Sequence, residues 1–157
     1  MFDHFNQNPP APSEPPPPPQ KVIRFDKSYF KTLPGLLKIA ALVCNFVGFI
    51  CIKVSFSWVS SIFYNILYWS GNILTTFLLL MYVFHFVEKY DRWPWLKVEF
   101  FYCAIMTLGY IATTIFAATI GDSAGYAVTF FGVCAIGIYG LDCYLKYKAW
   151  KRGLPPQ

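Results

Sequence analysis

Residues 62–86 read IFYNILYWSGNILTTFLLLMYVFHF, a stretch that contains no Asp, Glu, Lys or Arg. A helix needs about 20 mainly apolar residues to cross the ~30 Å hydrocarbon core of a bilayer, and this stretch is long enough. Three further apolar stretches of similar length lie at 33–52, 98–120 and 124–145. The sequence therefore predicts four membrane-spanning segments.

The composition favours a membrane protein over a soluble one. Of the 157 residues, 56% are hydrophobic and only 13% are charged, an excess that the core of a soluble domain does not need. The apolar runs are continuous and do not alternate with polar residues, which indicates helices that satisfy their own backbone hydrogen bonds in lipid. The predicted fold class is an all-α membrane protein, a four-transmembrane-helix bundle with a short interfacial helix before the first span.

The basic residues predict the orientation, because Lys and Arg are retained on the cytoplasmic side of a membrane. They gather in three places: Lys21, Arg24, Lys27, Lys31 and Lys38; Lys89, Arg92 and Lys97; and Lys146, Lys148, Lys151 and Arg152. Only Lys53 lies elsewhere. With four spans, the three basic groups share one side, so both ends of the chain are expected in the cytoplasm, facing anionic lipid.

The segment 1–21 is rich in proline, which neither builds a helix nor buries a core. We expect a disordered cytoplasmic tail with polyproline II character. Within it, residues 16–21 read PPPPQK, a pattern that some SH3 domains bind. The alternative is a solvated tail without a partner, because proline runs match such patterns easily.

A change of pattern follows at 22–32, where apolar and aromatic side chains gather on one side of a helical projection and basic ones on the other. This arrangement predicts a juxtamembrane amphipathic helix in the inner leaflet. Arg24, Lys27 and Lys31 would contact the lipid headgroups.

Charged residues inside a span are costly enough to be examined for function. Lys38 lies shallowly in the first span, and Asp142 lies at a similar depth in the fourth. The sequence favours either a snorkelling lysine or a structural pair between the two, with an ion or proton path as the alternative. Glu99 and Glu88 lie nearer the interface and are expected to be hydrated.

The second span carries Ser61, Asn65, Asn72 and Thr76 at helical spacing, which predicts one polar face turned into the bundle. Asn45 of the first span is expected to meet that face through hydrogen bonds between helices.

The third span carries a small residue every four positions, at Gly109, Thr113, Ala117 and Gly121. Such a stripe permits close approach of two helices. Internal packing is the favoured interpretation, and packing against another chain is the alternative.

Catalytic motifs are absent from the sequence: His4 and His85 stand apart from any metal-ligand cluster, and no nucleophile, phosphate-binding or dinucleotide motif occurs. We therefore expect no enzyme activity, no cofactor, no metal and no nucleic-acid partner. Cys143 lies beside the inner interface and is a candidate for S-palmitoylation.

The spans and particular residues together resemble the MARVEL-domain tetraspan proteins, most closely the chemokine-like-factor-like MARVEL transmembrane family. The resemblance is carried by DKSY at 26–29 and GLLKI at 35–39 before and within the first span. It continues with YGLD at 139–142 and the basic end that follows it. It extends over roughly 22–152, with the transmembrane domain at 33–152 and a C-terminal tail at 153–157.

The resemblance implies a non-enzymatic role in organising membranes. Such a protein would sort membrane proteins and lipids, including those of sterol-rich domains. It would act in vesicle traffic, membrane apposition or fusion, at the plasma membrane or at endosomal or vesicle membranes. The competing hypothesis is a small transporter or channel that uses Lys38, Asn45, Asn72 and Asp142.

Overall fold

The computed structural model describes residues 25–54, 58–90 and 92–156, with the backbone alone at 58–61. The proline-rich segment 1–21, its SH3-type pattern at 16–21 and Arg24 lie outside the described residues.

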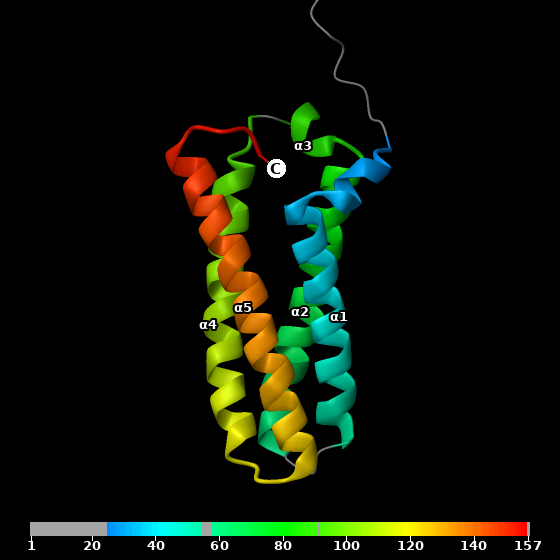
Figure 1. The fold of residues 1–157 in the computed structure, drawn as a ribbon, viewed down its shortest axis with the longest axis vertical. Coiled ribbons are helices and arrows are strands. Elements are labelled where there is room, and N and C mark those ends of the chain that lie inside the picture. Colours follow the sequence, from blue (N-terminus) through cyan, green and yellow to red (C-terminus); the bar gives the residue numbers. More distant parts are fainter. Residues whose placement is uncertain (1–24, 55–57, 91, 157) are drawn as a thin grey trace, which may run out of the picture.

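Four long helices make up most of the described chain (Figure 1): α1 (Leu33–Val54), α2 (Trp58–Val83), α4 (Trp95–Ala118) and α5 (Ser123–Lys151). Two short helices, the 3-10 helix η1 (Lys27–Lys31) and α3 (Phe86–Lys89), lie at one end, which we call the η1 end. The described residues contain no strand. Each long helix provides a segment long and apolar enough to cross a membrane, so the predicted all-α membrane fold is confirmed.

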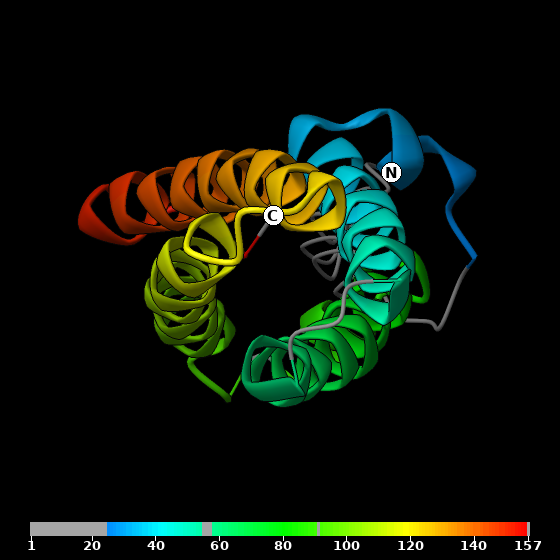
Figure 2. The ribbon, with the colours of Figure 1, turned by 90° about the horizontal axis from the view of Figure 1, so that it is seen from below.

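Seen along the bundle, the four long helices form a ring in the order α1, α2, α4, α5 (Figure 2). Helix α5 therefore lies between α1 and α4, and its contact with α4 is the most extensive in the bundle. Side chains from α1, α4 and α5 can consequently meet in the interior.

A tight turn connects α4 to α5. Gly121 has a φ of 76°, in the left-handed region that favours glycine. The Asp122 side chain then caps α5 by accepting a hydrogen bond from the Gly125 backbone N–H. A Cβ atom at Gly125 would lie 3.0 Å from the Ala117 carbonyl oxygen, so glycine allows α5 to begin directly against the end of α4.

In the described residues before α1, the short helix is the five-residue 3-10 helix η1 in place of the amphipathic helix that the sequence predicts at 22–32. Residues 22–24 of that predicted helix lie outside the described residues. The Asp26 side chain accepts a hydrogen bond from the Ser28 backbone N–H and caps it. The Asp26 backbone N–H donates to the Val83 carbonyl at 2.9 Å, which ties the segment to the end of α2.

All four long helices end at residues other than those expected, and the largest differences are in α2 and α5. Helix α2 stops at Val83 and not at Phe86, because His85 has a φ of 57° and interrupts the helix before α3. Helix α5 continues past Leu145 to Lys151, so part of the basic end of the chain is helical.

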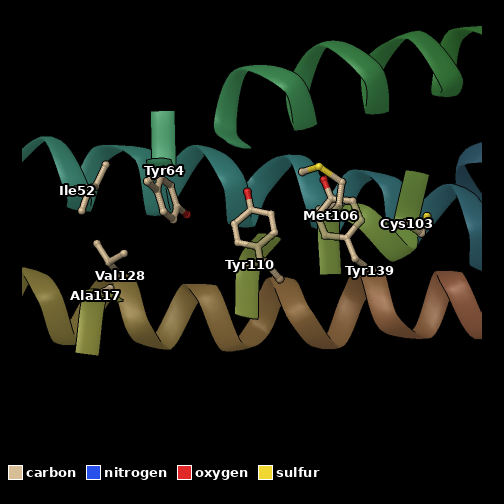
Figure 3. Packing of buried hydrophobic residues seen from close by; sticks show 10 residues of the cluster. Ile52, Tyr64, Cys103, Met106, Tyr110, Ala117, Val128 and Tyr139 are labelled. Atoms are coloured by element: carbon tan, nitrogen blue, oxygen red, sulfur yellow. The ribbon is translucent and has the colours of Figure 1, made fainter. Parts of the chain in front are cut away.

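Aromatic and small side chains fill the interior (Figure 3). Tyr64, Tyr110 and Tyr139 are almost fully buried, and the Tyr110 and Tyr139 rings stack with their centroids 5.7 Å apart. Ala117 and Val128 occupy the interior nearer the α4–α5 turn.

The outer surface is also apolar. On α4, for example, Ile105, Leu108 and Ile115 are 66%, 68% and 62% exposed. A soluble bundle would turn such residues inward, whereas a lipid environment favours them outside.

Candidate functional site

Four charged side chains meet inside the bundle near its η1 end. The Lys38 Nζ lies 2.9 Å from Glu99 Oε1 and 3.8 Å from Asp142 Oδ2, and the Lys146 Nζ lies 2.8 Å from Glu99 Oε2. None of the four residues is more than 5% exposed. We call these four residues the ion cluster.

Three helices position the ion cluster. Lys38 lies in the second turn of α1, and Glu99 lies in the second turn of α4. Asp142 and Lys146 are four residues apart on α5, so they share one face of that helix. Because α5 lies between α1 and α4, that face brings the two residues to Lys38 and Glu99.

Neighbouring polar groups each donate one hydrogen bond to the two carboxylates. The Tyr82 hydroxyl of α2 donates to Glu99 Oε2 at 2.7 Å, and the Cys103 thiol of α4 donates to Asp142 Oδ2 at 3.3 Å. The Tyr29 ring stacks on the Tyr82 ring with centroids 5.3 Å apart, so η1 covers this side of the site. Burial raises the pKa of the Tyr29 hydroxyl, which therefore stays protonated at neutral pH.

The ion cluster is formally neutral, with two cations and two carboxylates. Charges buried at membrane depth are costly unless they are paired, and here each has an oppositely charged partner within 4 Å. The arrangement therefore holds α1, α4 and α5 together, with α2 attached through Tyr82. Loss of any one charge would leave another uncompensated.

The sequence placed Lys38 and Asp142 at matching depth, and the structure brings the two side chains within 4 Å, although Glu99 is the closer partner of Lys38. The expectation that Glu99 is hydrated was wrong, because Glu99 is 0% exposed. Lys146 was assigned to the exterior basic end but is buried. Its spacing of four residues from Asp142 was the signal that could have identified it.

A second polar layer lies deeper in the bundle, centred on Asn45 of α1. Its side chain donates to the Tyr139 hydroxyl at 3.1 Å and accepts from the Tyr110 hydroxyl at 2.6 Å. The expected hydrogen bonds to the polar face of α2 are replaced by bonds to tyrosines of α4 and α5. Helix α2 still passes close by, because a Cβ atom at Gly71 would lie 2.9 Å from the Asn45 amide nitrogen.

Helix α2 contributes Thr75 to this layer. The Thr75 hydroxyl lies 2.7 Å from the Tyr102 hydroxyl and 3.2 Å from the Tyr139 hydroxyl. The Tyr102 hydroxyl also donates to the Gly71 carbonyl at 3.1 Å. Four helices are therefore joined by hydrogen bonds at membrane depth.

The predicted polar face of α2 is not the face that turns inward. Thr76 is exposed, and the Asn72 side chain donates to the Tyr68 carbonyl of its own helix. Asn65 is half-buried, and the side chain of Ser61 lies outside the described residues. The inward face instead carries Tyr64, Gly71, Thr75 and Leu78. The sequence pattern therefore predicted the wrong rotation of α2 about its own axis.

The small residues of α4 lie mostly inside. Thr113 and Ala117 are buried, and a Cβ atom at Gly109 would lie 2.6 Å from a methyl group of Leu67 on α2. Gly121 lies in the turn after the helix. The stripe thus contacts α2 and the interior of the same chain.

Of the residues predicted to contact lipid or to carry a lipid, those that the structure describes lie toward the η1 end. Lys27 and Lys31 of η1 are exposed there. Cys143 is half-buried on α5, with its Sγ 3.8 Å from the Phe100 carbonyl oxygen. Palmitoylation of Cys143 stays a prediction.

An acidic cavity of about 460 Å³ also lies at the η1 end, between η1 and the junction of α2 and α3. Its lining includes Asp26, His85 and Glu88, and the His85 Nε2 lies 3.8 Å from a carboxylate oxygen of each acid. Among the described residues, no group of three His, Cys, Asp or Glu side chains is placed to hold a metal ion.

Comparison with known proteins finds two relatives that match most of this chain. One is CKLF-like MARVEL transmembrane domain-containing protein 5 of Mus musculus, 22% identical over 152 residues that span 94% of this chain and 92% of that protein. The other is CKLF-like MARVEL transmembrane domain-containing protein 8 of Bos taurus, 25% identical over 142 residues that span 81% of this chain and 79% of that protein. No family model matches the chain, and no solved structure matches it significantly. Both relatives carry the family name that the sequence suggests, so the resemblance is confirmed.

Proposed function

We propose that this chain, a four-span relative of the CKLF-like MARVEL transmembrane proteins, is a non-enzymatic membrane-organising adaptor. It sorts membrane proteins and lipids in vesicle traffic, or in membrane apposition and fusion, through lateral contacts of its helices. It acts at the plasma membrane or at endosomal or vesicle membranes.

The distribution of apolar and polar side chains carries this proposal. Each long helix presents large apolar residues outward, among them Phe46, Ile73, Ile105 and Phe130, while the polar residues of the ion cluster and of the Asn45 layer turn inward. The connections between the helices are short. Most of the surface available for contact therefore lies in the membrane, where lipids and the helices of other membrane proteins are the possible partners.

The orientation proposed is that the η1 end lies in the cytoplasm. Lys27, Lys31, Lys148 and Arg152 are exposed at that end, whereas Lys53 lies at the opposite end. Retention of basic residues on the cytoplasmic side supports this orientation.

Transport through the bundle is the competing function, and the interior gives it little support. The cavity between the ion cluster and the Asn45 layer has a volume of about 10 Å³, enough for about one water molecule. The charges of the cluster are paired and gather near one end. A transporter needs polar groups that are accessible in turn from both sides, so we favour the organising role.

Proximity labelling tests the proposal. A labelling enzyme fused to the C-terminus would mark membrane proteins that lie beside the chain in living cells. We expect a reproducible set of integral membrane proteins, and we expect part of that set to change abundance or location when the chain is removed. Restoring the unmodified chain should reverse the change.

The control is a fusion of the same enzyme to an unrelated four-span protein in the same membrane. If the two fusions label the same proteins, or if removal of the chain changes none of the labelled proteins, the adaptor function is wrong. Flux of ions or small solutes through vesicles that contain the purified chain would instead favour transport.

A further inference from the structure

A second cavity at the η1 end differs in charge from the acidic one. It has a volume of about 240 Å³ and lies between the start of α1 and the end of α5. Lys146, Lys148 and Arg152 line it, together with the apolar side chains of Leu33, Leu145 and Leu154. None of the described residues that line this cavity is acidic.

The end of α5 fixes the shape of this cavity. Gly153 has a φ of 66°, its N–H donates to the Trp150 carbonyl at 3.0 Å, and the Leu154 N–H donates to the Ala149 carbonyl at 3.0 Å. These two bonds are the Schellman motif that ends many helices with a left-handed glycine. The motif turns Leu154 back along α5, so that Leu154 becomes one wall of the cavity.

We propose that this basic cavity binds the headgroup of an anionic phospholipid. Lys148 and Arg152 are four residues apart on α5 and therefore share the face that borders the cavity. Their cationic groups engage the phosphate, and the first part of an acyl chain lies against Leu33, Leu145 and Leu154. Basic cavities between transmembrane helices are suited to acidic headgroups.

The charges around the cavity support an anionic ligand. Lys146 is neutralised by Glu99 inside the bundle, but Lys148 and Arg152 are exposed. The carbonyl groups at the end of α5 carry partial negative charge and cannot hold an anion, so the two side chains must do so. The acidic cavity beside η1, with Asp26 and Glu88, would repel the same ligand.

This inference deepens the lipid contact in the function proposed above and rests on its orientation, which places the cavity at the anionic inner leaflet. The two proposals can fail separately. Lipid binding is measured with the purified full chain, whereas partner sorting is measured in cells.

The test compares two double variants that each reduce the formal charge from +5 to +3 by removing two cations. The site variant is Lys148→Gln with Arg152→Gln. The control is Lys53→Gln with Lys151→Gln, because neither of these lysines lines the cavity. All four residues are exposed, so neither variant should affect folding, and unfolding without lipid checks this.

Each detergent-purified protein is titrated with short-chain dioctanoyl phosphatidylserine, and binding is followed by the rise in the thermal unfolding midpoint. The basic side chains contribute about 1 kcal/mol each, so we expect binding about 25-fold weaker in the site variant and nearly unchanged in the control. Arg152→Gln alone should weaken binding about fivefold. Equal weakening in both double variants would overturn the site in favour of diffuse attraction.

Two further ligands test whether the cavity requires both the charged headgroup and the acyl chains of the lipid. Dioctanoyl phosphatidylcholine has the same chains without net charge and should bind far more weakly, and equal binding would mean that the cavity is only an apolar groove. Glycerophosphoserine has the headgroup without acyl chains and should also bind weakly. If it binds as tightly as the lipid, the site is one for soluble phosphate esters and the lipid proposal is wrong.

Discussion

Glu99 is the residue on which the ion cluster depends most, because it accepts from Lys38, Lys146 and Tyr82. Glu99→Gln keeps the shape of the side chain but leaves two ammonium groups with one carboxylate. Removing one partner of a buried ion pair costs about 3–5 kcal/mol. We therefore expect this variant to unfold at a clearly lower temperature in detergent.

Glu88→Gln is the matched control, since the Glu88 side chain is 67% exposed and lies outside the cluster. It should change the free energy of unfolding by less than about 0.5 kcal/mol. Equal effects of the two variants would show that burial of Glu99 does not hold the helices together.

Lys38 and Asp142 provide a second test, because removing both leaves the neutral pair of Glu99 and Lys146. Lys38→Met and Asp142→Leu should each destabilise the protein. The double variant should be more stable than the sum of the single effects predicts, by about 1–3 kcal/mol. The measurement is a double-mutant cycle by thermal unfolding, together with cellular function. A double variant that is stable but has no cellular function would favour transport over the organising role.

At the scale of the helices, two glycines of α5 test the contact with α4. A Cβ atom at Gly132 would clash with the Thr114 hydroxyl oxygen, whereas one at Gly137 would meet nothing within 4 Å. Gly132→Ala should therefore destabilise the bundle by about 1–3 kcal/mol through overpacking. Gly137→Ala should stabilise it by up to about 1 kcal/mol through helix propensity.

Thermal unfolding of both glycine variants in one detergent is the measurement. The two substitutions add the same methyl group to the same helix, so differences in composition cannot explain a difference in stability. A Gly132→Ala protein as stable as Gly137→Ala would mean that α4 and α5 are further apart than the structure has them.

The sequence predicted the existence of the four spanning helices but not how each is rotated. Length and continuous apolarity are enough for the first, because a span must cross the hydrocarbon core. Rotation is harder, because the lipid-facing residues of these helices are as apolar as the buried ones. Thr76 was expected to point into the bundle, but Thr75 is the residue that does. The sequence could not separate the two, because apolar residues flank both the buried and the lipid-facing side of the helix.

For the whole molecule, the testable claim is that both ends lie in the cytoplasm. Small tags at either end should be protected from reagents outside intact cells and should become accessible after permeabilisation. The physical reason is the excess of Lys and Arg at the η1 end. A tag placed at 55–57, between α1 and α2, serves as the control and should react without permeabilisation. An end that reacts in intact cells would reject this topology.

The candidate site could be predicted only in part, for a reason that concerns the whole bundle. The depths of Lys38 and Asp142 follow from their positions along single helices. The burial of Glu99 and Lys146 depends on how α1, α4 and α5 assemble and on the cover that Tyr82 provides, and these are relations between distant segments. Because Glu99 lies near the membrane interface, the sequence suggested that its side chain is hydrated. The packing of three helices instead buries it fully.

The order in which the helices are made separates Lys38 from its partners in the ion cluster. Lys38 lies in α1, and its carboxylate partners lie in α4 and α5, so it leaves the ribosome before either of them. A chain interrupted after α2 contains a lysine at membrane depth and neither acid. Such a fragment lacks both carboxylate partners of Lys38, so we expect membrane quality control to recognise it until α4 inserts and supplies Glu99.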